Sequence, residues 1–326
     1  MKYAIVLRKI VPVILTLVIF AVLFTRVDWE KICLVMKGIN VPYALMALIF
    51  SLFAITVFGV GRLQYTLQVF GLRISFKEVL VMKMGSMPLK VLPSGKWNLL
   101  SQIIYLKRNL NFSLLSGVHA TALRLFLDLF SCLLLIVPSG FYWILIKKME
   151  YSPWLKYAIL ASAFLGSCYI LFLILLRHPL FQKVFISRIS RLNLGWEIKL
   201  NSFFEFYRRL TYQKLFLLLV YSMVFQYSAL LVFYLLTKSL GLNIPWSSII
   251  LFLPIVIILT AIPISFLGLG VRESLILFFL SSYGPKEAIL SLGVLFSLCD
   301  QIFPSFLGLV FTKAFLAKLY TGYQGD

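Results

Sequence analysis

Six apolar runs, each about long enough to cross a bilayer, constrain the fold of this chain more than any other feature of its sequence. They lie at about 10–25, 42–60, 114–138, 157–176, 215–236 and 288–311. The hydrocarbon core of a bilayer is about 30 Å thick, so an α-helix needs roughly 20 apolar residues to cross it. Of the 326 residues, 61% are hydrophobic and only 13% are charged. The sequence therefore predicts an all-α polytopic membrane protein, a single transmembrane domain over residues 1–326.

The distribution of basic residues predicts how the helices are oriented. Residues 61–112 carry eight Lys or Arg residues against one acidic residue, and residues 177–214 carry eight against two. Loops rich in Lys and Arg face the cytoplasm, so both loops and both termini are predicted to be cytoplasmic, in a plasma-membrane protein. The first run lacks a small-residue cleavage site and is interpreted as a retained span. Because the net charge of +20 lies in such loops, it indicates contact with anionic lipid and not with nucleic acid.

Two further apolar stretches, 79–92 and 248–283, are interrupted and do not fit this count of spans. The second contains AIPISFLGLGVRES (261–274), in which a proline, two glycines and an Arg-Glu pair interrupt an apolar run. Non-helical backbone at membrane depth is tolerated where protein or a cavity surrounds it. We therefore expect two re-entrant helical hairpins. For 79–106, Lys83 and Lys90 leave an amphipathic surface helix as the alternative.

The two interrupted stretches resemble each other. Residues 70–93 align without gaps on residues 240–263, an offset of 170, and an offset of 172 pairs Asp128 with Asp300. The aligned identities are Gly71 with Gly241, Leu72 with Leu242, Ile74 with Ile244 and Pro93 with Pro263. Since the first copy begins inside and the second outside, the segments 61–138 and 237–311 are predicted to be inverted repeats, as in many secondary transporters. Chance similarity between apolar segments remains the alternative.

Arg124 and Asp128 lie inside an apolar run, where a charge at a helix centre costs at least ~2.5–3.5 kcal/mol and therefore needs a partner. Four residues apart, the two side chains share one helix face and are able to pair. One interpretation is a structural ion pair that holds the bundle together. The other is a phosphate-binding arginine that Asp128 orients, because a guanidinium matches the geometry of phosphate oxygens.

The break at Gly268, Gly270, Arg272 and Glu273 carries a second group of candidate residues. Arg272 and Glu273 are adjacent, so on a helix they point in different directions. Glu273 fits a plain charged helix start, because the dipole at a helix N-terminus favours an anion. Alternatively, free N–H groups and Arg272 receive a lipid phosphate while Glu273 pairs with a cation from the other repeat. The turn Ser94-Gly95-Lys96 would supply the counterpart in the first repeat.

The segment 263–308, PISFLGLGVRESLILFFLSSYGPKEAILSLGVLFSLCDQIFPSFLG, carries a family resemblance. It resembles the C-terminal signature of the lysylphosphatidylglycerol synthase transmembrane-region family, the flippase-like proteins that include the membrane part of the multiple peptide resistance factor. The pattern is a proline, then G-x-G-x-R-E opening a helix, a glycine after it, and a span that ends in proline and glycine. The matching residues are Pro263, Gly268, Gly270, Arg272, Glu273, Gly284, Pro304 and Gly308. The counterpart at 91–108 matches more loosely, and a basic residue that the resemblance would place near Gln102 is absent.

The resemblance implies a domain that moves, or helps to move, a polar-headed lipid between leaflets: an anionic, aminoacylated or polyprenyl-phosphate-linked lipid. Because the chain carries no aminoacyl-transferase domain, we do not expect it to synthesise lysylphosphatidylglycerol by itself. We expect a protein that is not an enzyme. Two alternatives remain: a non-catalytic subunit that recruits a lipid-modifying enzyme or glycosyltransferase, and a membrane-embedded lipid transferase. The four cysteines form no CxxC pair and the two histidines have no ligand-type neighbours, so neither a metal nor a cofactor is predicted.

Overall fold

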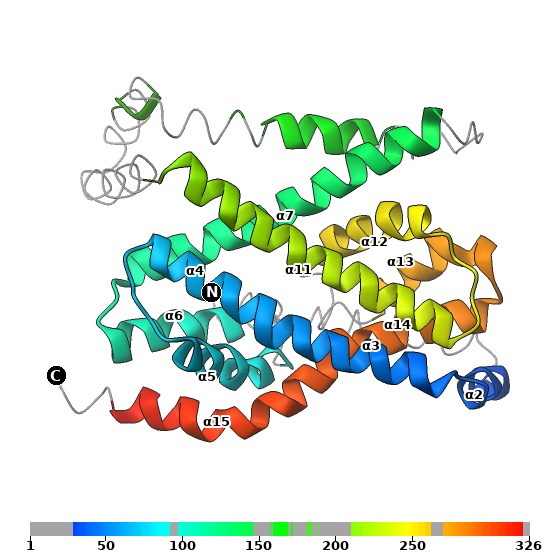
Figure 1. Cartoon of the computed structure of the whole chain (residues 1–326), viewed down its shortest axis with the longest axis horizontal. Helices are drawn as coiled ribbons and strands as arrows, with labels where there is room; N and C mark the ends of the chain where they lie inside the picture. The colour runs from blue at the N-terminus through cyan, green and yellow to red at the C-terminus, as the bar shows by residue number, and fades with distance from the viewer. Residues whose placement is uncertain are drawn as a thin grey trace, which may run out of the picture.

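The computed structural model describes residues 29–91, 97–145, 157, 159–168, 171, 181–183, 187, 210–261 and 270–321. Within these residues the chain folds into helices joined by short turns, and no residue is in a strand (Figure 1). This confirms the all-α prediction for the described part of the chain.

The helices fall into two series of similar order. The first contains α2 (Trp29–Lys37), α3 (Val41–Phe53), η1 (Ala54–Phe58), α4 (Gly59–Val69), α5 (Phe76–Ser86), η2 (Met87–Val91), α6 (Trp97–Leu110) and α7 (Leu114–Leu145). The second contains α11 (Tyr212–Ser239), α12 (Trp246–Ala261), α13 (Val271–Leu280), η4 (Ser281–Tyr283), α14 (Lys286–Ser297), η5 (Leu298–Ile302) and α15 (Phe303–Thr321). Both η1 and η5 are π-helical turns inside a longer helix.

Four continuous helices are long and apolar enough to cross a membrane. They are Val41–Val69, Leu114–Ile144, Tyr212–Ser239 and Lys286–Tyr320. They correspond to four of the six predicted spans. The predicted span 10–25 lies outside the described residues, and within 157–176 the structure describes the apolar helix Ile159–Cys168.

Both interrupted stretches form two shorter helices in place of one long helix. The helices α5 and α6 pack against each other on either side of residues 92–96, and α12 and α13 do the same on either side of 262–269; both breaks lie outside the described residues. The helix α5 buries Val79 and the run Met82–Ser86 against its neighbours. It is therefore an interior helix of the protein.

The turns that precede the two broken helices have the same geometry. At the end of α4, the Gly71 N–H donates to the Gln68 carbonyl at 2.9 Å and Leu72 donates to Leu67 at 3.0 Å. At the end of α11, Gly241 donates to Lys238 at 3.2 Å and Leu242 donates to Thr237 at 2.9 Å. Both glycines have positive φ, 87° and 69°, which an L side chain rarely adopts. These are two Schellman motifs, 170 residues apart, so the aligned glycines and leucines have the same structural role.

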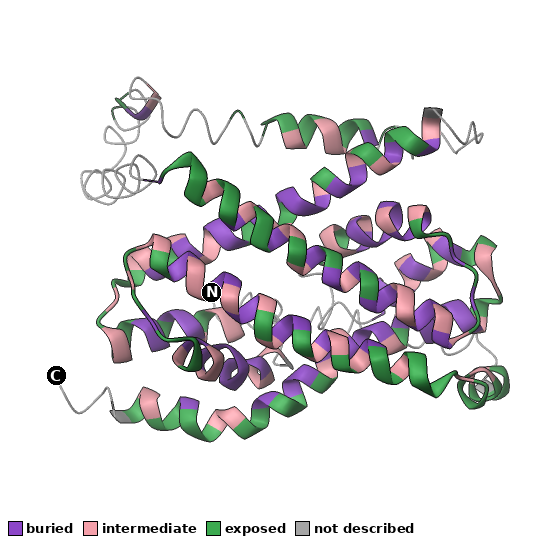
Figure 2. Ribbon diagram, in the orientation of Figure 1, coloured by how far each residue is buried: buried purple, intermediate pink, exposed green. Residues whose placement is uncertain are grey.

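The two series also pack on each other reciprocally. The helix α3 of the first series lies against α11, which opens the second, while α5 packs on α15 and α12 packs on α7. In Figure 1, α5 and α6 lie towards one end of the molecule and α12 and α13 towards the other, with α3 and α11 running between them. Figure 2 shows the buried residues concentrated where these helices face one another.

Close approach of α15 to α5 depends on two glycines. A Cβ atom on Gly308 would lie 2.5 Å from the Met84 carbonyl oxygen, and one on Gly85 would lie 2.4 Å from Cβ of Phe315. The short separation allows Thr312 Oγ1 to donate to the Gly85 carbonyl at 3.4 Å. The interface therefore joins the first series to the last helix of the second through packing of backbone on backbone.

Candidate functional site

A cavity of about 450 Å³ opens among the helices of both series. Its described lining comes from η1, α4, α5, η2, α6, α7, α11, α12, α13, α14 and η5. Seven charged side chains face it: Arg62, Lys83, Lys90, Arg124, Asp128, Arg272 and Asp300. Five are basic and two are acidic, so the described lining has a formal excess of three positive charges.

The sequence-predicted pair of Arg124 with Asp128 is not formed. Asp128 on α7 instead accepts a hydrogen bond from Arg62 on α4, and the two side chains form an ion pair. The i, i+4 spacing places Arg124 within reach of Asp128, but Arg62 approaches from a neighbouring helix and forms the ion pair with the carboxylate. Arg124 itself is 7% exposed and has neither a hydrogen bond nor an ion pair among the described residues.

The second aspartate has an arginine of its own. Nη1 of Arg272 on α13 lies 3.3 Å from Oδ2 of Asp300 on η5. Both aspartates follow the broken helix of their series, but their arginines come from different places. The residue that aligns with Arg272 at the offset of 170 is Gln102, which also lines the cavity and donates through Nε2 to Ser86 Oγ at 2.8 Å. In the first series, Arg62 supplies the guanidinium that position 102 lacks.

Three cations of the cavity, Lys83, Lys90 and Arg124, have no carboxylate partner among the residues that the structure describes. The buried Lys83 donates through Nζ to the Ile55 carbonyl at 3.2 Å, which satisfies one of its three donors. Gly59 leaves the room for this ammonium group, since a Cβ there would lie 1.9 Å from Nζ. A buried charge without a counterion is strongly unfavourable, so the cavity is suited to an anion.

Two aromatic rings stabilise the cations from the side of α11 and α14. The Arg62 guanidinium lies 4.6 Å from the ring centre of Phe225, and Lys83 Nζ lies 5.5 Å from the same ring. The Arg272 guanidinium lies 5.3 Å from the ring of Phe296. Contacts of this kind are worth about 0.5–2 kcal/mol each. They offset part of the cost of burial, but they neutralise no charge.

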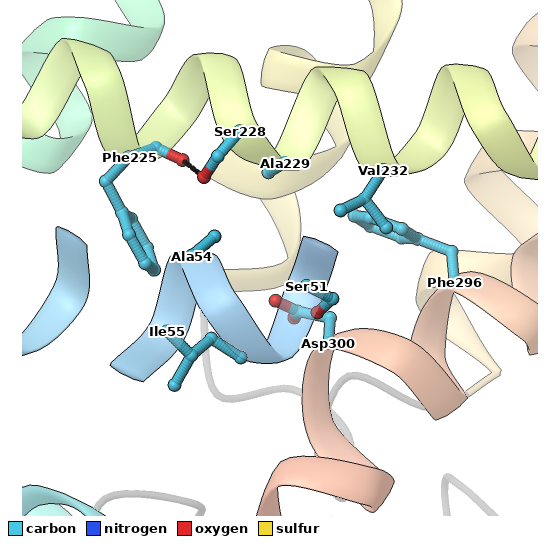
Figure 3. Close-up of a pocket in the computed structure, with 9 residues that line it drawn as sticks. All are labelled: Ser51, Ala54, Ile55, Phe225, Ser228, Ala229, Val232, Phe296 and Asp300. Atoms are coloured by element: carbon cyan, nitrogen blue, oxygen red, sulfur yellow. Dashed lines mark hydrogen bonds between the residues drawn. The ribbon is translucent and has the colours of Figure 1, made fainter. Parts of the chain in front are cut away.

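A small side pocket of about 20 Å³ adjoins the cavity between η1, α11 and η5 (Figure 3). It shares Asp300, Phe225 and Phe296 with the cavity and has room for about one water molecule. At its edge Ser51 Oγ donates to the Cys299 carbonyl at 2.8 Å, which ties α3 to the π-helical turn η5. π-helical turns in long helices are frequent at functional sites.

Glu273 does not act as predicted for a binding residue. Its side chain is 2% exposed and is not part of the cavity lining. One carboxylate oxygen accepts from the Gly270 N–H at 2.6 Å and the other accepts from Ser297 Oγ at 2.6 Å. Among the described residues Glu273 therefore pairs with no cation of the other repeat, and it lies in the first turn of α13, as the interpretation as a charged helix start expects. The glutamate therefore satisfies one N–H at the start of α13, that of Gly270, and places a negative charge beside this helix N-terminus.

The remaining predicted site residues divide into three groups. Arg124, Asp128, Arg272 and Asp300 meet in the cavity. Gly270 is buried with a φ of 80° and shapes the start of α13, but it does not line the cavity. The others, Gly268, Ser94, Gly95 and Lys96, lie outside the described residues.

Sequence reasoning misses Arg62, Lys83 and Lys90 as site residues. Arg62 counts as a loop cation in the charge distribution, although it lies just beyond the end of the apolar run 42–60. Lys83 and Lys90 enter only as arguments for a surface helix. The sequence does contain a signal that both lysines are site residues. They lie inside an apolar stretch that aligns with a transmembrane-type segment, and a charge in such surroundings needs an interior partner. Within the described part of the chain, no three His, Cys, Asp or Glu side chains lie close enough together to hold a metal ion.

Comparison with known proteins identifies one family. The family model described as the lysylphosphatidylglycerol synthase TM region matches residues 9–308. No curated protein matches the chain. The match includes every described residue of the cavity and extends far beyond the signature segment 263–308.

Proposed function

Because the chain belongs to the lysylphosphatidylglycerol synthase transmembrane-region family, we propose that it moves a lipid with an anionic head group between the leaflets of a membrane. The family and the apolar helices identify a membrane protein with a lipid-related function. The observation that supports transport is the cavity itself. It holds an excess of cations inside a bundle whose long helices are the length of a bilayer.

The physical reason is the cost of carrying a charged head group across hydrocarbon. An unaccompanied ion pays a large desolvation cost in such a medium. A cavity with Arg124, Lys83 and Lys90 replaces the water around a phosphate by charge-assisted hydrogen bonds, while the tails remain in lipid. The anion in turn compensates the charges that the protein leaves without carboxylate partners.

We propose that the two series of helices are inverted repeats, with six full spans, cytoplasmic termini and the broken helices as re-entrant hairpins in the plasma membrane. The identical turns at Gly71 and Gly241 support a common origin of the two series. The reciprocal packing of α5 on α15 and of α12 on α7 supports a two-fold arrangement. In transporters of this kind, one repeat rocks against the other around a fixed central site.

We further propose that the chain is not an enzyme. A lipid transferase needs a carboxylate that is free to hold a metal ion or to accept a proton. Asp128 and Asp300 face one cavity, but each is engaged by an arginine. This engagement favours a role for the aspartates in positioning the guanidinium groups.

Transport is testable with purified protein in liposomes that contain a trace of chain-labelled phosphatidylglycerol. Dithionite bleaches label in the outer leaflet only, so a protein-dependent increase in the bleached fraction measures exchange between leaflets. We expect the wild type to accelerate exchange and Arg272→Gln to slow it, while Arg73→Gln, an exposed arginine in the loop after α4, serves as the charge-matched control. Exchange no faster than in protein-free liposomes, for labelled lipids of every head-group class, would refute transport by the chain alone.

A further inference from the structure

We infer that the cavity selects a lipid whose head carries two or more negative charges, a phosphate monoester or a diphosphate, over phosphodiester lipids and over aminoacylated lipids with a positive head. The inference rests on the proposed function only in taking the ligand to be a lipid. It concerns which head group the cavity neutralises.

The charges of the cavity lining favour a head group with more than one negative charge. Arg62 is engaged by Asp128, and Arg272 is engaged by Asp300. Within the described lining, three basic side chains then remain for the ligand, with a formal charge of +3: Lys83, Lys90 and Arg124. A phosphodiester carries one negative charge, whereas a phosphate monoester carries about −1.5 to −2 at neutral pH. Only the monoester or diphosphate head brings the cavity close to neutrality.

The placement of the three cations favours a head group with several phosphate oxygens. The three cations line one cavity together with both ion pairs. Lys83 interacts electrostatically with Arg124, with the Arg62–Asp128 pair and with Lys90, while Lys90 interacts with the Arg272–Asp300 pair. A terminal phosphate presents three strong acceptor oxygens, enough for the guanidinium of Arg124 and the ammonium of Lys83 together. A second phosphate would reach towards Lys90.

The aspartates argue against a cationic head group. A lysyl ester of phosphatidylglycerol carries two ammonium groups and one phosphate charge, so its head is positive. Asp128 and Asp300 are the acidic residues in the described lining, and both already accept from arginines. A lysyl group would meet like charges and no free carboxylate, which costs several kcal/mol.

Binding can be measured without any transport step, on the purified full chain in neutral detergent, by titration of intrinsic tryptophan fluorescence. The probes are farnesyl diphosphate, farnesyl phosphate, short-chain phosphatidylglycerol, short-chain lysylphosphatidylglycerol and inorganic diphosphate. We expect the two farnesyl probes to bind at least about tenfold more tightly than phosphatidylglycerol, since one additional charge-assisted contact is worth about 1.5–3 kcal/mol and 1.4 kcal/mol is tenfold. Lysylphosphatidylglycerol should bind most weakly. Inorganic diphosphate should bind more weakly than farnesyl diphosphate, because it lacks the tail.

Matched variants identify the contacts. Arg124→Gln and Lys83→Gln should each weaken binding of farnesyl phosphate about tenfold or more, whereas the exposed control Arg73→Gln should leave it unchanged. Circular dichroism of each variant checks that the helices form. If Lys83→Gln does not fold, Arg124→Gln alone decides. Farnesyl phosphate binding to Arg124→Gln as tightly as to the wild type would overturn the assignment.

Two other results would also overturn the inference. Phosphatidylglycerol or lysylphosphatidylglycerol binding as tightly as farnesyl phosphate would remove the charge selection. Inorganic diphosphate binding as tightly as farnesyl diphosphate would make the ligand a free anion and not a lipid. The failure of the transport proposal looks different: the binding order would be as expected, yet labelled lipids would not exchange. Conversely, exchange of phosphatidylglycerol without the expected binding order would refute the head-group selection and leave transport standing.

Discussion

Substituting Arg124 by glutamine should stabilise the ligand-free protein. Arg124 is 7% exposed and lacks any hydrogen bond or ion pair among the described residues, while Asp128 on the same helix face is engaged by Arg62. Its charge repels those of Arg62 and Lys83 and attracts that of Asp128. Such a cost is typical of functional sites, which commonly sacrifice stability.

The magnitude follows from two effects. Like charges that interact over roughly 8 Å repel by about 2 kcal/mol at an effective dielectric constant of 20. The attraction of Asp128 cancels about one of the two repulsions, so that one remains. Burial of the guanidinium adds to this cost, since a charge at the centre of a membrane helix costs about 2.5–3.5 kcal/mol on insertion scales. Part of that burial cost persists for the polar amide of glutamine. We therefore expect Arg124→Gln to gain roughly 1–3 kcal/mol, which corresponds to a rise of a few degrees in Tm.

The assay is thermal unfolding of delipidated protein in neutral detergent, followed by intrinsic fluorescence at one scan rate. Arg73→Gln removes the same charge from an exposed loop position and should leave Tm unchanged. Asp128→Asn should have the opposite sign, because it leaves Arg62 buried among other cations at a cost of about 3–5 kcal/mol. A Tm for Arg124→Gln at or below that of the wild type would refute the reasoning, since it would show that Arg124 has a stabilising partner.

Two further predictions concern the contact of α15 with α5. Gly308→Ala should be less stable than the control Gly61→Ala by about 1–3 kcal/mol. A Cβ at Gly308 would lie 2.5 Å from the Met84 backbone oxygen, whereas one at Gly61 has no neighbour closer than 3.9 Å. Equal denaturant midpoints for the two variants would contradict the close approach of the two helices. Burial raises the pKa of Glu78, but hydrogen bonds from Lys318 and Tyr105 and the charge of Lys318 outweigh it and hold the pKa below its ordinary value of 4.5. The stabilisation by this ion pair is complete above pH 4.5 and is lost as the pH falls through the lower folded-state pKa. Below about pH 4.5, Tm should therefore fall more steeply in the wild type than in Glu78→Gln. Parallel pH profiles of Tm would show that the pair does not link the helices.

Hydropathy and glycine placement along the chain are sufficient to predict most of the secondary structure. Four of the predicted spans coincide with long apolar helices, and both interrupted stretches form paired shorter helices. These features are local, because whether a segment crosses a membrane depends on its own length and composition. The aligned glycines at 71 and 241 are recognisable for the same reason, since only glycine takes the positive φ of a Schellman turn at little cost.

Part of the site is also visible in the sequence. Arg124, Asp128, Arg272 and Asp300 stand out because each is a charge within an apolar region, and all four face the cavity. Charges in such surroundings are expensive wherever the chain folds. Their positions along the sequence are therefore enough to identify residues that need partners or a ligand.

Which charges meet is decided only by the tertiary structure. Asp128 pairs with Arg62, 66 residues away, and not with Arg124 one turn before it. Glu273 caps its own helix and bonds Ser297, 24 residues away. Spacing along a helix shows which side chains are within reach, but five cations compete for two carboxylates in this cavity. The outcome depends on which helices pack side by side, and packing between distant segments leaves no periodic signal in the sequence.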